Sequence, residues 1–191
     1  METATMVVGS YALATFAGGC FWCTQAIFKR LKGVKSVVSG YTGGTVPDPS
    51  YEDVCNGTTG HAEAIQIEFD PQDISYEKLL EIFFHLHDPT TLNQQGNDVG
   101  IQYRSVIFYH NDKQKTDAQK VKVQIEQEHL YADPIVTEIT PFTVYYPAED
   151  YHQNYFENNK TGGYCSYVIT PKIQKLLREY KQDVKEEYQE K

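Results

Sequence analysis

An apolar run, two glycines and a helical period follow one another directly near the start of the chain. Residues 11–17 contain Tyr, Leu, Thr and Phe and stop at Gly18-Gly19, a pattern typical of a strand that enters a tight turn. From Phe21 to Leu31 the apolar side chains recur at close to helical spacing. The sequence therefore predicts a strand, a glycine turn and a helix, with Cys20 where the turn meets the helix.

Along the rest of the chain, segments in which apolar residues alternate with polar ones are interspersed with segments in which apolar residues have helical spacing. Apolar or alternating runs predict further strands over residues 34–41, 62–69 and 105–110. Helical spacing predicts further helices over residues 75–86, 111–128, 149–158 and 171–180. Short β segments are expected over 135–146, and the paired glycines within 160–165 predict a pliable loop. The first six elements therefore have the order βαββαβ.

One domain accounts for the whole length. A chain of 191 residues is within the usual size of a single domain, and no repeat or linker divides it. We therefore expect one domain over 1–191. Residues 1–9, and the polar tail over 181–191, are expected to be flexible or frayed.

Charge and cysteine usage restrict the partners and the compartment. The net charge of -9 argues against nucleic acid, which binds clustered Lys and Arg, and favours a small-molecule or peptide partner. The start of the chain lacks the basic residues of a secretory leader, and no apolar run is long enough for a membrane span. Four scattered cysteines do not form a disulfide scaffold, so we expect a reducing compartment, the cytoplasm, with reactive thiols. We also expect the chain to be a monomer.

Cys20 is the first candidate for chemistry. At the start of a helix its sulfur can face unpaired N–H groups and the positive end of the helix dipole, which favour the thiolate. The alternative is an inert buried thiol, because free cysteines are among the most buried residues. Position alone leaves both interpretations open.

The residues around Cys20 form the motif Gly18-Gly19-Cys20-Phe21-Trp22, which contains the only tryptophan of the chain. Further short motifs follow between about Ala14 and Lys172, and they are Val38-Ser39-Gly40-Tyr41, Pro49-Ser50-Tyr51-Glu52, Thr59-Gly60-His61-Ala62-Glu63, Asp88-Pro89-Thr90-Thr91, Gln95-Gly96-Asn97-Asp98, Gln102-Tyr103-Arg104-Ser105, Tyr151-His152-Gln153 and Gly163-Tyr164-Cys165. Together they resemble the A-type peptide methionine sulfoxide reductases, whose active-site motif is G-C-F-W.

The resemblance implies a fold and an activity. The fold is α+β, a two-layer sandwich with a ferredoxin-like βαββαβ core and C-terminal helices and loops. The activity is thiol-dependent reduction of the S epimer of methionine sulfoxide, in proteins or free, through a Cys20 sulfenic acid and an intramolecular disulfide. Thioredoxin, or dithiothreitol in an assay, is the implied external reductant, with no bound metal, flavin or nucleotide.

Glu63 is the residue that the resemblance assigns as proton donor to the sulfoxide oxygen. A general acid near neutral pH needs a carboxyl that burial keeps partly protonated. Glu63 has the same strand parity as Ile65 and Ile67, so it is expected to face the apolar side. The alternative is a strand-end glutamate that bends out to water.

The resemblance also implies six residues near the substrate, which are Phe21, Trp22, Tyr51, Asp98, Tyr103 and His152. The two tyrosines are expected to hydrogen-bond the sulfoxide oxygen, and the two aromatic residues after Cys20 to receive the methyl group. Ordinary core packing is the alternative for the aromatic residues, and turn formation is the alternative for Asp98.

Cys23 departs from the commonest family pattern and creates a Cys-x-x-Cys motif with Cys20. This favours two rival interpretations: a thioredoxin-like disulfide oxidoreductase, and a structural zinc site that uses both cysteines. The downstream motifs argue against the first rival, and the lack of a second paired motif argues against the second. Cys55 is expected to be inert.

Two cysteines compete for the role of resolving thiol, which forms the disulfide with Cys20. Cys165 follows two glycines at the place where many family members carry their recycling cysteine, and a hinged loop can swing its sulfur to Cys20. Cys23 is one helical turn away, so that bridge is also geometrically possible. We expect Cys165 to be the resolving thiol, with Cys23 as the alternative.

Overall fold

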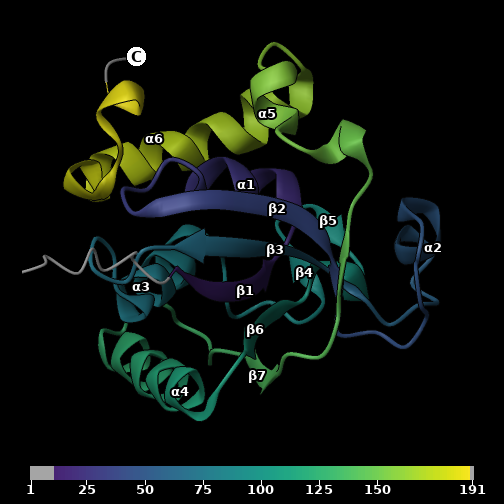
Figure 1. Cartoon of the computed structure of the whole chain (residues 1–191), viewed down its shortest axis with the longest axis horizontal. Coiled ribbons are helices and arrows are strands. Elements are labelled where there is room, and N and C mark those ends of the chain that lie inside the picture. Colours follow the sequence, from purple (N-terminus) through teal and green to yellow (C-terminus); the bar gives the residue numbers. More distant parts are fainter. Residues whose placement is uncertain (1–10, 190–191) are drawn as a thin grey trace, which may run out of the picture.

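A curled six-stranded sheet forms the centre of the computed structural model, which describes residues 11–189 (Figure 1). Its strands are β1 (Ala12–Gly18), β2 (Val34–Thr42), β3 (Ala62–Phe69), β6 (Ser105–Tyr109), β7 (Glu138–Pro141) and β8 (Tyr145–Pro147). Their order is β7-β6-β1-β3-β2-β8, and each neighbouring pair is antiparallel except β6 and β7. A separate hairpin joins β4 (Gln94–Gln95) to β5 (Asp98–Val99).

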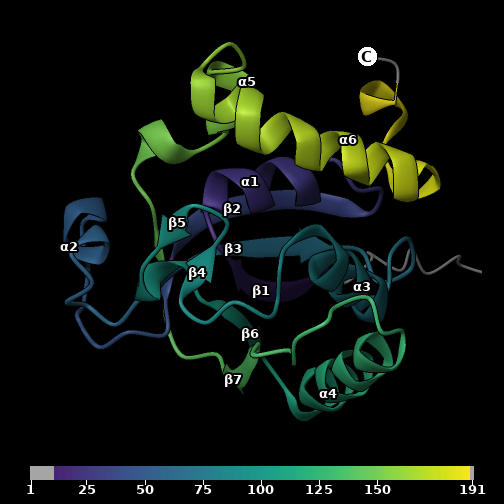
Figure 2. The same cartoon turned by 180° about the vertical axis from the view of Figure 1, so that it is seen from behind.

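The helices lie mainly around this sheet. They are α1 (Phe21–Phe28), α2 (Tyr51–Cys55), α3 (Tyr76–Leu86), α4 (Asp112–Gln127), α5 (Tyr155–Asn158) and α6 (Thr170–Glu179). Short 3-10 helices cover Ile101–Tyr103, Asp150–His152, Lys181–Asp183 and Glu186–Tyr188, and a π-helix covers Cys165–Ile169. In Figure 2, α1 and α3 lie in front of the strands, and α6 packs over α1. No helix within residues 11–189 is long and apolar enough to cross a membrane.

Local sequence explains where the two longest helices begin. Ser75 precedes α3, and its hydroxyl accepts a hydrogen bond of 3.1 Å from the backbone N–H of Lys78. Asn111 caps α4 in the same way: its side-chain oxygen accepts a hydrogen bond of 2.9 Å from the backbone N–H of Gln114. Such caps satisfy N–H groups that have no partner within the helix, typically worth about 1 kcal/mol.

Aromatic side chains join the sheet to the helices that cover it. Phe16 of β1 is fully buried and packs its ring 5.8 Å from that of Phe28 in α1 and 5.0 Å from that of Phe83 in α3. These rings belong to the largest apolar cluster of the described residues. These contacts hold β1 against α1 and α3, and the turn that carries Cys20 lies between β1 and α1.

The observed elements differ from expectation in three places. The helix predicted over 149–158 is divided into a 3-10 turn and α5, because Asn154 between them takes a left-handed conformation with φ of 54°. The loop predicted over 160–165 ends in the π-helix, so Cys165 lies at the start of a helical element. The helix α2 and the hairpin of β4 and β5 were not predicted.

The tail was predicted to be frayed over 181–191, and this is wrong for its described part. Val184 is fully buried and pairs with Leu31, and the backbone N–H of Lys185 donates to the carbonyl of Arg30. Residues 181–189 are therefore packed against the end of α1. Residues 1–9, also expected to be flexible, lie outside the described residues.

Candidate active site

Most of the residues singled out in the sequence line one small cavity of about 150 Å³. The lining residues come from several elements and are Cys20, Phe21, Trp22, Tyr51, Glu63, Asp98, Tyr103 and Tyr164. Residues more than 140 positions apart in the chain thus meet at one place. Tyr164 is the one member of this set to which the sequence assigned no role, although it lies beside Cys165 in the Gly163-Tyr164-Cys165 motif.

The turn between β1 and α1 places Cys20 at the cavity. Gly19 has a φ of 87°, and a Cβ atom there would lie 2.5 Å from the Cγ atom of Gln95, so only glycine fits. Cys20 then occupies the N-cap position of α1, as the strand, turn and helix pattern predicted. Cys20 is 7% exposed and lines the cavity.

Burial works against the thiolate that the helix start was expected to favour. Burial, followed by the neighbouring thiol of Cys23, raises the pKa of the Cys20 thiol well above its ordinary value. The aromatic walls and the elements packed over α1 remove water from the sulfur, and this desolvation disfavours the charged thiolate. The expected lowering of the pKa of Cys20 by its position alone is therefore not found.

Cys23 lies one helical turn from Cys20 and is fully buried. A hydrogen bond with the Cys20 thiol is the largest influence on the pKa of Cys23 and lowers it, against the opposing effect of burial. The Cys23 sulfur is also 3.9 Å from the hydroxyl of Tyr164. The two thiols therefore share a proton, and a thiolate forms more readily on the pair than on Cys20 alone.

Glu63 is buried at the start of β3, on the apolar side that its strand parity predicted. Its side chain is only 1% exposed, and its Oε2 atom accepts a hydrogen bond of 2.9 Å from the backbone N–H of Phe21. Burial raises the pKa of Glu63 to about 8, and this outweighs the lowering effect of the Phe21 N–H. The carboxyl group is therefore largely protonated at neutral pH, as a general acid requires.

Aromatic rings form the apolar walls of the cavity. Phe21 stacks on Tyr51 with a centroid distance of 6.4 Å. Trp22 stacks on Tyr155 at 3.6 Å and meets Tyr164 edge to face at 5.7 Å. These contacts fix the rings beside Cys20, where an S-methyl group can contact them.

Two tyrosines supply hydroxyl groups near the carboxyl group of Glu63. Burial, with the nearby charge of Glu63 as a smaller influence, raises the pKa values of both Tyr51 and Tyr103 above their ordinary range. Both hydroxyl groups therefore keep their protons and remain hydrogen-bond donors.

Asp98 and Tyr164 form a polar edge of the same cavity. The hydroxyl of Tyr164 donates a hydrogen bond of 2.7 Å to the Oδ2 atom of Asp98. Asp98 belongs to the short strand β5, so it does not act only as the turn former that was the alternative.

His152 lies behind the cavity wall. Its imidazole is buried, packs against Phe21 at 5.0 Å and Tyr51 at 4.4 Å, and accepts a hydrogen bond of 2.9 Å at Nδ1 from the indole N–H of Trp22. The cavity-lining set does not include His152, which contacts three of the lining side chains from behind.

The other two cysteines occupy different surroundings. Cys165 is 1% exposed and packs in an apolar cluster that also contains Cys20, Cys23 and Ile173. Burial raises the pKa of Cys165. Cys55 at the end of α2 is half-buried beside Tyr51, outside the cavity lining. The rival zinc site gains no support, because no group of three or more metal-ligating side chains within residues 11–189 is arranged to hold an ion.

Comparison with known proteins agrees with this geometry. The sequence profile of the family described as peptide methionine sulfoxide reductase matches residues 12–185. The chain is 54% identical over 175 residues to the peptide methionine sulfoxide reductase MsrA of Polynucleobacter asymbioticus, and the aligned region covers 92% of each protein.

Solved structures show the same likeness. The crystal structure of Mxr1 from Saccharomyces cerevisiae in reduced form is 35% identical, covers 86% of this chain and 94% of that one, and gives a TM-score of 0.76. Mxr1 in complex with Trx2 is similar with a TM-score of 0.55 at 27% identity, over 81% of this chain and 91% of that one. The chain therefore belongs to the peptide methionine sulfoxide reductase family.

Proposed function

We propose that the chain reduces the S epimer of methionine sulfoxide, in proteins or free, to methionine, with Cys20 as nucleophile and Glu63 as general acid. The observation that carries the proposal is the pairing of a largely protonated, 1% exposed carboxyl group with a thiol in one small aromatic cavity. A sulfoxide needs a soft nucleophile at sulfur and a proton at oxygen, and these two groups supply them.

In the first step, the Cys20 thiolate attacks the sulfoxide sulfur after its proton has moved to Cys23. Glu63 donates its proton to the sulfoxide oxygen and becomes a carboxylate. The substrate sulfur gains two electrons and leaves as methionine, while the oxygen ends on the Cys20 sulfur as a sulfenic acid. Atoms and charge balance. The proton of Glu63 ends on the oxygen of the sulfenic acid, and the negative charge that the thiol pair carried ends on the Glu63 carboxylate.

Recognition of the substrate uses the cavity walls. The S-methyl group contacts the rings of Phe21 and Trp22, and the hydroxyl groups of Tyr51 and Tyr103 donate to the oxygen. Asp98 lies at the polar edge, where it can accept from the backbone N–H of a bound residue. His152 contributes indirectly, by accepting the hydrogen bond that holds the indole ring of Trp22.

For the resolving thiol, the surroundings favour Cys23 over Cys165. The case for Cys165 depended on a mobile loop and on its place in the family motif. The motif match remains, but the residue is buried at the start of a π-helix and burial raises its pKa. The neighbouring Cys20 thiol lowers the pKa of Cys23, so Cys23 more readily supplies the thiolate that attacks the sulfenic acid. That attack forms a Cys20–Cys23 disulfide and releases the oxygen as water.

An external dithiol then returns both cysteines to the thiol form. Thioredoxin is the proposed reductant, supported by the similarity to Mxr1 in complex with Trx2, and dithiothreitol can replace it in an assay. The residues named above carry the whole cycle without a bound cofactor. We also propose a ferredoxin-like core, supported by the antiparallel order β6-β1-β3-β2 with α1 and α3 over one face (Figure 2).

A dithiothreitol-driven assay on the separate epimers of N-acetylmethionine sulfoxide tests this function. The S epimer should be converted to N-acetylmethionine and the R epimer should remain, as chromatography can show. C20S should convert neither epimer, while C55S, which removes a thiol outside the cavity, should retain activity. Failure of the unmutated chain to reduce the S epimer, or turnover by C20S, would overturn the proposal.

A further inference from the structure

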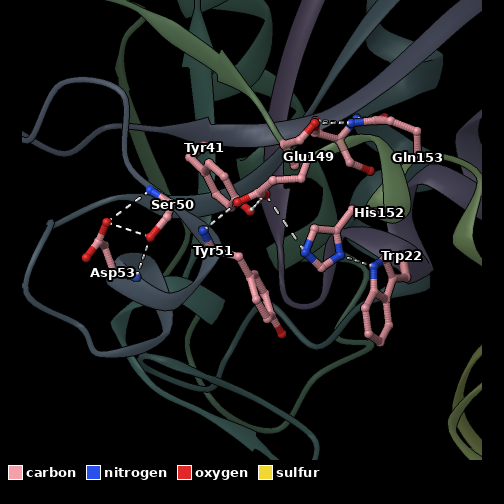
Figure 3. Close-up of polar contacts among 10 residues, drawn as sticks. Trp22, Tyr41, Ser50, Tyr51, Asp53, Glu149, His152 and Gln153 are labelled. Atoms are coloured by element: carbon pink, nitrogen blue, oxygen red, sulfur yellow. Dashed lines mark hydrogen bonds and ion pairs between the residues drawn. The ribbon is translucent and has the colours of Figure 1, made fainter.

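Glu149 joins two walls of the active site, and the chemistry described above gives it no role. Its Oε1 atom accepts a hydrogen bond of 2.8 Å from the backbone N–H of Tyr51 at the start of α2. Its Oε2 atom accepts one of 2.8 Å from the hydroxyl of Tyr41, a fully buried residue of β2. Figure 3 shows the carboxylate between these two donors. One carboxylate therefore connects a cavity-lining helix to the central sheet.

The same Oε2 atom faces His152. It lies 4.0 Å from the Nε2 atom of the imidazole, which has no hydrogen-bond partner among the described residues. The other ring nitrogen, Nδ1, accepts from the indole N–H of Trp22, so a neutral imidazole carries its proton on Nε2, toward Glu149 (Figure 3). Glu149, His152 and Trp22 thus form a line that ends at the cavity wall.

The surroundings of His152 leave Glu149 as the charged group that acts on it. Besides Trp22, the rings of Phe21, Tyr51 and Tyr151 pack against the imidazole, with centroid distances between 4.1 and 5.0 Å. Burial lowers the pKa of His152, and the charge of Glu149 raises it in opposition. Glu149 itself is ionised, because backbone and Tyr41 hydrogen bonds outweigh burial and lower its pKa.

The segment that carries Glu149 and His152 is held in place independently of the carboxylate. The side chain of Gln153 accepts from the backbone N–H of Ser39 at 3.0 Å and donates to the carbonyl oxygens of Ser39 and Ala148, both at 2.9 Å. Loss of the Glu149 charge should therefore leave the segment on the edge of β2. What it changes is the orientation of the groups that Glu149 touches.

We propose that Glu149 is a positioning residue that sets two walls of the cavity, Tyr51 directly and Trp22 through the tautomer of His152. The kinetic consequence depends on the proposed function, but the effect on Trp22 does not. Protonation of His152 at Nδ1 removes the acceptor of the indole N–H, since two donors then face each other. The hydrogen bond from Trp22 to His152 should therefore be lost at pH values below the pKa of His152, and the Glu149 charge should set the pH at which this happens.

Tryptophan fluorescence gives a direct readout, because Trp22 is the only tryptophan of the chain. The unmutated protein should show a fluorescence transition as His152 becomes protonated, and H152Q should lack it. In E149Q the midpoint should move to lower pH by about one unit, the scale expected for removing one charge near 4 Å. D150N, which removes a neighbouring exposed charge, should retain the unmutated midpoint.

Three results would overturn the inference: the absence of a fluorescence transition that H152Q abolishes, the same midpoint in E149Q as in the unmutated protein, or an equal shift of the midpoint in D150N. A kinetic measurement adds a second readout. E149Q should reduce kcat/KM for a methionine sulfoxide peptide by roughly tenfold, the usual scale for one lost charged hydrogen bond, while iodoacetamide alkylates Cys20 at the unmutated rate. Unchanged kcat/KM would overturn the kinetic role. An unmutated chain that fails to reduce the peptide would overturn the proposed function instead, and the fluorescence shift would still decide the role of Glu149.

Discussion

The Oε2 atom of Glu63 accepts a hydrogen bond of 2.9 Å from the backbone N–H of Phe21, the residue that follows Cys20. This bond ties the buried carboxyl group to the first turn of the helix that presents the nucleophile. The acid and the thiol therefore keep a constant relative position while the substrate enters. Pre-organisation of this kind lowers the barrier without movement of either group during the reaction.

Replacement of Glu63 by Gln should slow the reductase step by ~10² or more, the usual scale for loss of a positioned acid. The unmutated rate should fall as pH rises through about 8, because the protonated acid is lost there, and E63Q should lose that dependence. Single-turnover release of methionine measures both effects. E68Q, on the same strand but paired with Lys35 at the surface, should behave as the unmutated enzyme. E63Q rates within about twofold of the unmutated enzyme, far short of that scale, would exclude Glu63 as the acid.

The same substitution should change the pH dependence of stability. The folded pKa of Glu63 is raised from 4.5 to about 8, so its contribution is complete below pH 4.5 and is lost as pH rises toward 8. E63Q does not lose this contribution. As pH rises between these values, the free energy of unfolding of E63Q should therefore increase relative to that of the unmutated protein, by on the order of a few kcal/mol in total. Urea unfolding at several pH values measures the difference. A constant difference across the range would mean that Glu63 is not buried with a raised pKa.

The two candidate resolving thiols can be separated by parallel variants. C23S should release about one methionine per enzyme, more slowly than the unmutated chain because Cys20 loses its proton acceptor, and then stop with thioredoxin because the sulfenic acid finds no partner. C165S, a matched loss of a buried thiol, should keep most of its turnover. Peptide mapping after treatment with substrate alone should find Cys20 joined to Cys23. A predominant bridge to Cys165, with normal turnover of C23S, would reverse the assignment.

Tyr164 offers a test of a residue that the sequence did not single out. Its replacement by Phe removes the hydroxyl that donates to Asp98 and lies 3.9 Å from the Cys23 sulfur. We expect kcat/KM to fall by roughly tenfold, as for a hydrogen bond to a charged group. Y167F alters a tyrosine of the same segment that is 85% exposed, and should have no effect. Equal activities of Y164F and Y167F would contradict the role given to this hydroxyl.

Local patterns in the sequence predicted the parts of the site that depend on neighbours in the chain. The glycine turn placed Cys20 at a helix start, and strand parity placed Glu63 on the buried side, since both follow from backbone geometry within a few residues. The raised pKa of Cys20 was not predicted, because the groups that bury it come from distant segments.

Other features were missed for the same reason. The polar composition of the tail suggested fraying. Val184 is nevertheless buried, because the tail packs against Leu31, more than 150 positions earlier in the chain. Cys165 is held by its cluster with Cys23 and Ile173, which the glycines before it did not indicate. Long-range packing decides these cases, and a single sequence carries little trace of it.

Trapping the intermediate on Cys20 tests the central claim most directly. In the double variant C23S/C165S no resolving thiol remains near the cavity, so a sulfenic acid on Cys20 should persist after one turnover. Incubation with the S epimer and dimedone, followed by mass spectrometry of the peptides, should find the adduct on Cys20 in step with one equivalent of methionine. Release of methionine without an adduct on Cys20, or with the adduct on Cys55, would contradict the account.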